Sequence, residues 1–331
     1  MNLLESLNEI TPVEEHCLTV DKTMLFKRND LFAPPDLGGI NGNKLMQAIY
    51  IVSKLDESVK YIINASSNQS PQHLIIAAVA QYYNKLSMSF FGGLKENALK
   101  LEELQKCRFF NMIFFISRSP YKNVLKKRCE SLQRETPNSV IIEFGFTPNY
   151  DKNKNYLLNK KELTDYMLVT GKQVRNLPNS ITTLIITGGS CNTLAQIYTG
   201  FVHYGYPKNL KKIIVIGIGG YFFNSNFSHK MHFLNIPTNL LEIEYINLFN
   251  NDRNKKYKLK FYESTHDPRI EDNIVFHPTY EAKSIMYIKE NRPELITPNT
   301  LFWIVGGQTN QSALEKVRKV KYPLEIYNFD K

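Results

Sequence analysis

The stretch Gly38-Gly39-Ile40-Asn41-Gly42-Asn43-Lys44-Leu45 places one lysine in a loop that is rich in glycine. Glycine permits a positive φ and lets the backbone approach a ligand closely. After Lys44 the apolar residues Leu45, Ala48 and Ile49 recur at helical spacing, so Lys44 lies near a helix start. A partly desolvated lysine beside the positive end of a helix is suited to act as the amine nucleophile that forms a Schiff base. A solvated lysine at a turn is the commoner arrangement for the loop alone.

The loop and the residues before it also resemble a known enzyme family. Lys27-Arg28-Asn29-Asp30-Leu31, a glycine pair and Gly42-Asn43-Lys44-Leu45 resemble the pyridoxal 5'-phosphate (PLP) enzymes of the tryptophan synthase β fold, called fold type II. Within them the pattern is most similar to the 1-aminocyclopropane-1-carboxylate deaminase and D-cysteine desulfhydrase group. The resemblance implies that Lys44 holds PLP through a Schiff base. The family's next two residues, Arg-Lys, are replaced here by Met46-Gln47.

Strands and helices alternate along much of the chain. The fully apolar run at 213–218 is typical of a strand buried on both faces of a parallel sheet. The alternation therefore predicts an α/β protein with open parallel sheets. The family resemblance adds two domains with the PLP cleft between them: a large one from 1–44 and 161–331, and a small one from 45–160. We expect a helix at 95–106, an exposed polar passage at 147–160, and a helix with an edge strand within 223–260.

A second glycine-rich turn, Gly188-Gly189-Ser190-Cys191-Asn192-Thr193, joins a strand to a helix. Its backbone N–H groups and the helix N-terminus form an anion cradle, to which Ser190 and Thr193 add hydroxyl donors. The turn lacks the Gly-Lys-Ser/Thr of a P-loop, and a simple capped turn would also explain it. It resembles the Gly-Ser-Gly-Gly-Thr loop that binds the PLP phosphate, with Cys191 and Asn192 replacing two glycines.

The turn Ser66-Ser67-Asn68-Gln69-Ser70-Pro71-Gln72 resembles the family's Gln-Ser-Asn-His/Gln turn, in which Ser assists catalysis and Asn binds the cofactor's 3'-oxygen. Two registers fit. One keeps Asn68 as the cofactor ligand. The other keeps Ser70 as the catalytic serine and puts Pro71 in the place of the asparagine. Cofactor chemistry favours the first and helix length the second, so Asn68 and Ser70 are both candidates, with Gln72 as a third. Each would also serve as a plain helix cap.

A third landmark is His277-Pro278-Thr279-Tyr280-Glu281-Ala282-Lys283-Ser284, which is similar to the family's Asp-Pro-Val-Tyr-x-Gly-Lys-Ala/Ser. The resemblance implies that Tyr280 approaches the substrate and that Glu281 faces the pyridine nitrogen, where a carboxylate strengthens the electron sink. An acidic first turn of a helix gives the same pattern. Gly306, with Gly307, resembles the last glycine pair beside the cofactor.

Composition limits the remaining classes. No run of 18 apolar residues is present, so we expect no membrane span. The four cysteines are scattered, as in a cytoplasmic protein with reduced thiols. The seven histidines show no convincing ligand spacing, so no metal is expected. The net charge of +10 indicates either a nucleic-acid partner or a compositional drift towards Lys, Asn, Ile and Tyr. The oligomeric state stays open between monomer and homodimer.

Three functions follow from these patterns. The first is a PLP-dependent lyase or deaminase that acts on an amino acid through Lys44, with Lys44 or Tyr280 as the base, and releases ammonia and a keto acid. The second is a PLP enzyme that modifies an amino-acyl group on a nucleic-acid base, a DNA hypermodification. The basic charge and the altered turns at Pro71, Cys191 and Asn192 favour this alternative, because a basic surface binds phosphates. The third is a non-catalytic binding protein of the same fold.

Overall fold

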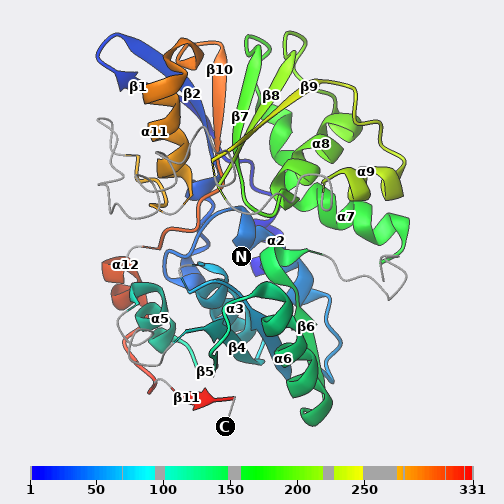
Figure 1. The fold of residues 1–331 in the computed structure, drawn as a ribbon, viewed down its shortest axis with the longest axis vertical. Coiled ribbons are helices and arrows are strands. Elements are labelled where there is room, and N and C mark those ends of the chain that lie inside the picture. The colour runs from blue at the N-terminus through cyan, green and yellow to red at the C-terminus, as the bar shows by residue number, and fades with distance from the viewer. Residues whose placement is uncertain are drawn as a thin grey trace.

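Two sheets, one mostly and one wholly parallel and each covered by helices, make up the structure, which is a computed structural model (Figure 1). It describes residues 2–68, 70–93, 101–147, 158–218, 227–248, 274–278, 280–309, 311–323 and 325–329. The expectations for 95–100, for most of 147–160 and for 249–260 lie outside these ranges. Within them, no helix is long and apolar enough to cross a membrane, and no group of three acidic, histidine or cysteine side chains could hold a metal.

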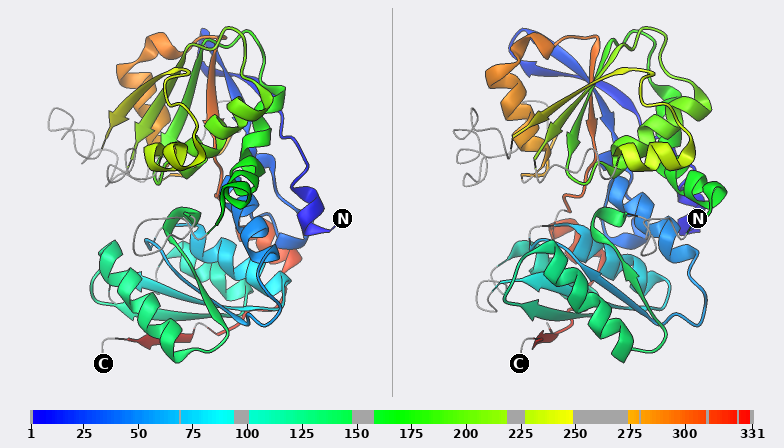
Figure 2. Two further views of the ribbon diagram at one scale, coloured as in Figure 1. Left: turned by 90° about the vertical axis from the view of Figure 1, so that its right-hand side faces the viewer. Right: turned by 45° about the vertical axis from the view of Figure 1, so that its right-hand side comes forward.

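The first sheet has six strands in the order β1-β2-β10-β7-β8-β9. β1 and β2 form an antiparallel hairpin, and every other neighbouring pair is parallel. Their bounds are β1 Val13–Thr19, β2 Lys22–Arg28, β7 Thr183–Gly188, β8 Lys212–Gly217, β9 Glu242–Asn247 and β10 Thr300–Ile304. Helices α7 (Lys160–Gly171), α8 (Asn192–Tyr204) and α9 (His229–Leu234) share one apolar cluster with this sheet. α11 (Glu281–Asn291) packs on the other face (Figure 2).

The second sheet has five parallel strands in the order β11-β5-β4-β3-β6. Their bounds are β3 Tyr61–Ala65, β4 Leu86–Gly92, β5 Met112–Ser117, β6 Ser139–Ile142 and β11 Glu325–Asn328. One apolar cluster joins this sheet to α2 (Asn43–Ser53), α3 (Gln72–Tyr82) and α5 (Glu102–Lys106). α6 (Lys122–Glu135) covers the opposite face. The short helix α1 (Leu3–Ser6) contacts α2, and the short helix α12 (Gln311–Val317) contacts the turn at 35–37.

Burial explains why these segments adopt their elements. In β8, residues 213–216 are all 0% exposed, as an apolar strand in the middle of a parallel sheet requires. In α3, residues 74–80 are at most 1% exposed, because the helix lies between its sheet and α2. Three alanines within that run let α3 approach both layers. The N-terminus of α3 is thereby held in a set position, and it carries the turn at 66–70.

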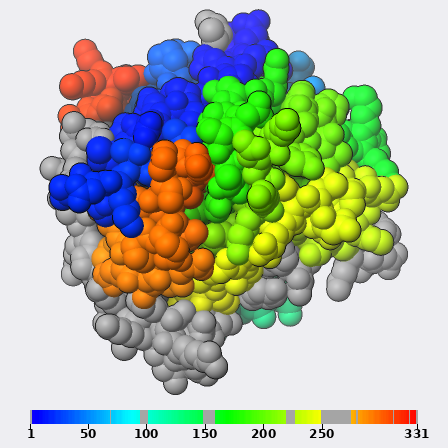
Figure 3. Space-filling view, turned by 90° about the horizontal axis from the view of Figure 1, so that it is seen from above, coloured from blue at the N-terminus to red at the C-terminus, as the bar shows by residue number. Residues whose placement is uncertain are grey.

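The predicted α/β class with open parallel sheets is confirmed. One boundary differs from the prediction: β11 pairs with β5 in the five-stranded sheet, whereas the sequence placed all of 161–331 in the large domain. The strand is only four residues long and mostly exposed, so no apolar run announces its partner. The rest of the division, at residues 44 and 161, stays a prediction. Figure 3 shows the N-terminal strands (blue) beside α11 (orange) at the end of the molecule that is formed by the six-stranded sheet.

Two glycines allow α7 and α8 to touch. A Cβ atom built on Gly200 would lie 2.1 Å from the carbonyl oxygen of Gly171, and one on Gly171 would lie 2.6 Å from the carbonyl oxygen of Gln196. Because real Cβ atoms do not come so close to backbone oxygens, any larger residue would push the helices apart. This contact sets the position of α8, whose N-terminus carries the turn at 188–193.

We therefore expect Gly200→Ala to lower the free energy of unfolding by about 1–3 kcal/mol, the usual cost of overpacking. Urea unfolding followed by circular dichroism measures it. Val202→Ala is the matched control, because Val202 lies on the same helix and is 47% exposed. If both variants unfold within about 0.5 kcal/mol of the wild type, the helices have room to separate and the contact is not a constraint.

Candidate functional site

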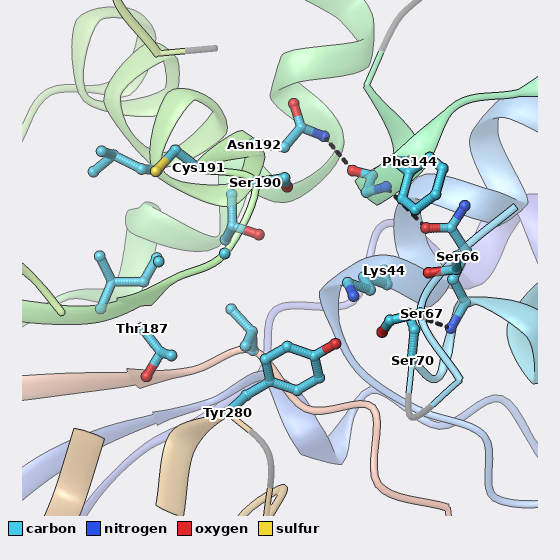
Figure 4. A pocket seen from close by; sticks show the side chains of 18 of the residues that line it. Lys44, Ser66, Ser67, Ser70, Phe144, Thr187, Ser190, Cys191, Asn192 and Tyr280 are labelled. Atoms are coloured by element: carbon cyan, nitrogen blue, oxygen red, sulfur yellow. Dashed lines mark hydrogen bonds between the residues drawn. The ribbon is translucent and has the colours of Figure 1, made fainter. Parts of the chain in front are cut away.

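A cavity of about 200 Å³ lies where the carboxyl ends of strands from both sheets face each other. From the first sheet it is lined by the turn after β7 and by residues after β10, and from the second by the turn after β3 and by residues after β6. Figure 4 shows Lys44 between these turns. The predicted site residues that line it are Lys44, Ser70, Gln72, Gly188, Gly189, Ser190, Cys191, Asn192, Thr193, Tyr280 and Gly306. Asn68 and Glu281 do not line it.

Lys44 is the second residue of α2, and the loop before it is fastened to the end of β10. Gly42 has a φ of 92°, and a Cβ there would lie 2.4 Å from the carbonyl oxygen of Val305. The N–H of Asn43 donates to that same oxygen at 2.8 Å. Glycine is thus required at position 42 both for its conformation and for the close approach. The contact aims Lys44 into the cavity, where its Nζ lies 5.1 Å from the centroid of the Tyr280 ring.

The turn at 188–193 connects β7 to α8 without the two family glycines. Cys191 adopts the left-handed conformation, with a φ of 56°, and its side chain is buried. The Asn192 amide nitrogen lies within 3.5 Å of the Gln47 Oε1, of the Tyr166 hydroxyl, and of two carbonyl oxygens at 145 and 146. Asn192 therefore ties the turn to α2, to α7 and to the loop after β6. Its Oδ1 is buried without a hydrogen-bond partner in the described structure.

The turn at 66–70 brings Ser70 into the cavity and leaves Asn68 outside it. The Asn68 amide nitrogen instead lies 3.5 Å from the point where a Cβ on Gly93 would be. The buried His73 ring holds the turn, with one nitrogen 3.1 Å from the Ser67 carbonyl oxygen and the other 2.5 Å from the Ser89 hydroxyl. This geometry favours the register in which Ser70, and not Asn68, matches a family residue.

Gln72 lines the cavity, but both atoms of its amide are engaged with backbone. Its Nε2 donates to the Glu143 carbonyl oxygen at 3.1 Å, and its Oε1 accepts from the Gly145 N–H at 2.8 Å. Gln72 therefore braces the loop after β6. A Cβ on Gly145 would lie 2.6 Å from the Ser190 Oγ, so this loop touches the turn at 188–193 directly. The two halves of the cavity wall thus meet at Gly145.

Glu281 lies behind the cavity wall and is 0% exposed. Its Oε1 accepts from the N–H groups of Val305 and Gly306, at 3.1 Å each, and both of those residues line the cavity. Its Oε2 is buried and has no partner in the described part of the chain. Burial raises the pKa of this carboxyl to about 7, although the two N–H groups oppose the shift. The Oε2 atom, which has no partner among the described residues, can therefore share a proton with a ligand atom that reaches it.

His277 stands where the family has an aspartate, and it is buried beside Tyr280, with ring centroids 4.6 Å apart. Burial is the main cause that lowers its pKa to about 3, and the Lys44 ammonium group adds to the effect. The ring is therefore neutral at pH 7. It adds no second positive charge next to Lys44.

The sequence analysis did not name nine of the lining residues as candidates: Ser66, Ser67, Lys122, Phe144, Gly145, Ile186, Thr187, Leu194 and Val305. The serines lie in a turn whose other members were predicted. Phe144 is the second residue after the strand β6 and precedes a glycine. Because the carboxyl ends of parallel strands meet at one edge, the position of Phe144 after a strand was a usable signal. Lys122 is the first residue of α6.

The arrangement suits a flat ligand that has an aldehyde at one end and a phosphate at the other. Lys44 offers an amine, and the turn at 188–193 offers backbone N–H groups at the start of a 13-residue helix. Behind the wall, Glu281 has a buried carboxyl oxygen without a partner among the described residues. A Cβ on Gly189 would meet nothing within 4 Å, so the turn leaves open space above its backbone. These groups are of the kinds that hold a phosphate and a protonated ring nitrogen.

No family model matches the chain. The chain is similar to the "O-seryl-dTMP PLP-dependent decarboxylase" of Salmonella phage ViI, with 26% identity over 339 aligned positions that cover 86% of this chain and 78% of that protein. Among solved structures it is similar to an ACC deaminase homologue, with a TM-score of 0.61, 16% identity and 94% of each chain covered. It is also similar to threonine deaminase isoform 2 of Solanum lycopersicum, with a TM-score of 0.56, 13% identity, and 96% and 89% covered.

The pKa of Glu281 gives a test of this site in protein freed of bound small molecules. Below the usual carboxyl pKa of 4.5 its contribution to stability is fully present, and it is lost as the pH rises through 7, because the unfolded chain ionises more easily. We expect the free energy of unfolding of the wild type to fall by about 1 kcal/mol relative to Glu281→Gln between pH 6 and pH 8. Urea unfolding at pH 6, 7 and 8 measures it. Parallel curves for the two proteins would contradict the raised pKa.

Proposed function

We propose that this chain, which has the fold of the PLP-dependent fold type II enzymes, binds PLP at Lys44 and decarboxylates a seryl group that is joined through oxygen to a pyrimidine nucleotide. The observation that carries the proposal is the similarity to the phage O-seryl-dTMP decarboxylase, which extends over 86% of the chain. In such a reaction the bond between the α-carbon and the carboxylate breaks, CO2 leaves, and the α-carbon receives a proton. The product is an aminoethyl ether of the nucleotide.

The site residues support PLP as the cofactor. Lys44 would bind its aldehyde, the backbone N–H groups at 188–193 would hold its phosphate, and Glu281 would hold a proton at its ring nitrogen. PLP, when bound, supplies the electron sink for the pair of electrons that the departing CO2 leaves behind. The remaining work falls to the protein, which must orient the substrate carboxylate and exclude water.

Two groups are placed to deliver the proton. The Lys44 ammonium lies within cation–π distance of the Tyr280 ring. Lys44 can therefore donate the proton from a position next to Tyr280. His277, neutral and buried behind Tyr280, leaves the Lys44 ammonium as the cation next to that ring. Ser70 is buried at 2% exposure and also lines the cavity, where its hydroxyl can hold the substrate carboxylate.

Positive charge supports a nucleotide substrate. Lys44 and Lys122 both line the cavity, and the chain has a net charge of +10. A phosphate-bearing substrate gains from such a field, whereas a small zwitterionic amino acid gains little. The deaminase and lyase alternative draws on the fold, which many reactions share. The two functions differ in their products, because a deaminase releases ammonia and a keto acid.

The decisive test is the product that the protein forms from O-seryl-dTMP, the nucleotide named for the phage relative. We expect the wild type to carry an absorbance band near the visible edge and to release CO2 without ammonia. Lys44→Ala should lose the band and slow CO2 release by about 100-fold or more, since it removes a proton donor and a cofactor anchor. Lys54→Ala is the matched control, because Lys54 follows the same helix and does not line the cavity. Release of ammonia and a keto acid by the wild type would establish the deaminase instead.

A pair of variants tests the role of the turn at 66–70. Ser70→Ala should lower kcat/KM by about tenfold or more, because it removes a hydrogen-bond donor from a buried wall of the cavity. Asn68→Ala should change kcat/KM less than threefold, because Asn68 lies outside the cavity. Steady-state kinetics on the same substrate measures both. The reverse ranking would restore the register in which Asn68 binds the cofactor.

A further inference from the structure

We propose that Phe144 and Lys122 form a subsite for the nucleotide part of the substrate, in which the pyrimidine base stacks on the Phe144 ring and a phosphate lies at the Lys122 ammonium. This inference rests on the proposed function and deepens it, because it names the residues that would distinguish a nucleotide from a free amino acid. The two residues are defined below as the Phe144–Lys122 pair.

The pair lies at the edge of the cavity on the side of the five-stranded sheet. Phe144 is the second residue after β6, is half-buried, and lines the cavity. Figure 4 shows it on the same side of Lys44 as Ser66 and Ser67, across from Thr187. Lys122, the first residue of α6, also lines the cavity but is exposed, so it marks where the cavity opens to solvent. Its Nζ lies 5.5 Å from the centroid of the Phe144 ring.

The residues on both sides of Phe144 are anchored. Glu143 forms an ion pair with Lys126 at 2.6 Å, and its carbonyl oxygen accepts from Gln72. Gly145 donates its N–H to Gln72, and the carbonyl oxygen of Phe146 accepts from Tyr166 and Asn192. The Phe144 ring is therefore presented on a backbone that is fixed before any ligand arrives. A pre-organised aromatic surface loses little entropy when a base stacks on it.

Size decides where the nucleotide must lie. The cavity measures about 200 Å³, which is less than the roughly 300–1,000 Å³ typical of sites that enclose a drug-sized ligand. Lys44, the turn at 188–193 and Tyr280 occupy its inner wall, so the amino-acyl group must sit there. The base and sugar phosphate must then extend past the opening. The Phe144–Lys122 pair offers at that opening an aromatic face and an ammonium group, the two chemistries that bind a base and a phosphate.

The same nucleotide chemistry could come from a free nucleotide or from a DNA chain. α6 runs outward from Lys122 and carries Lys127 and Arg134, both exposed, at a spacing of seven residues that places them on one face. These two cations do not line the cavity. They would add to the binding of a polymer and not to that of a mononucleotide, so the two sources predict different salt dependences.

The test is binding to the PLP-loaded protein, measured by isothermal titration with dTMP and with an oligothymidylate at several salt concentrations. We expect Phe144→Leu to weaken dTMP binding by about tenfold and Phe144→Tyr to retain it, because stacking needs the ring. Lys122→Gln should weaken dTMP binding and lower the salt slope by about one, whereas the matched control Lys127→Gln should leave dTMP binding unchanged. DNA is identified as the source if the oligonucleotide shows a steeper salt slope than dTMP and if Lys127→Gln makes that slope shallower.

A kinetic arm separates this subsite from the proposed function. With the nucleotide-linked serine ether, Phe144→Leu should lower kcat/KM by about tenfold, while the turnover of a free O-methylserine stays unchanged. The subsite is overturned if dTMP does not bind, or if it binds equally well to Phe144→Leu and Lys122→Gln. It is also overturned if Lys122→Gln loses PLP on dialysis with unchanged dTMP affinity, since Lys122 would then serve the cofactor. Intact, pair-dependent dTMP binding without any CO2 release would retain the subsite and refute the decarboxylase.

Discussion

The hydrogen bonds of the Asn192 amide hold the two halves of the molecule in register. Asn192 begins α8 of the six-stranded half, and its nitrogen reaches Gln47 of α2, Tyr166 of α7 and the carbonyl oxygens after β6. A second bond, from Gln47 to Gln196 at 2.8 Å, runs parallel to these. The side chains are buried, so breaking one of these bonds would leave a polar group without a replacement partner, which is costly. We call these hydrogen bonds of Asn192 and Gln47 the seam. The width of the cavity, and hence the distance from the turn at 188–193 to Lys44, depends on the seam.

The seam also accounts for two unexpected residues in the anion turn. A non-glycine residue in the left-handed region, such as Cys191, costs on the order of 1 kcal/mol. Cys191 offsets part of this by burying its side chain in the apolar cluster of α7 and α8. Asn192 converts the next position from a bare backbone into the anchor of the seam. The turn therefore has a less flexible backbone and more fixed contacts than a glycine-rich turn would have. A rigid turn of this kind can hold a ligand in one arrangement.

The sequence carried enough signal to predict the α/β class. It also singled out Lys44, the turn at 188–193 and Tyr280, which line one cavity, because each lies in a glycine-rich or polar segment at a strand or helix end. It could not decide between Asn68 and Ser70, because the choice depends on how far α3 extends, and α3 is positioned by burial against α2 and the sheet. It misplaced β11, whose four residues carry no apolar period. It also passed over Phe144, because a single aromatic after a strand is ordinary until the opposite sheet is known to face it.

A contact between the substrate and the opening of the cavity would influence which reaction the site performs. The bond at the α-carbon that breaks is the one whose orientation the protein sets, so a common cofactor site can serve deamination or decarboxylation. In a free amino acid, only groups near Lys44 can set that orientation. A nucleotide-linked serine has a second, distant point of attachment, and its binding energy can be used to turn the α-carboxylate relative to Ser70 and Tyr280. Residues at the opening, outside the family motifs, would then determine the reaction as well as the substrate.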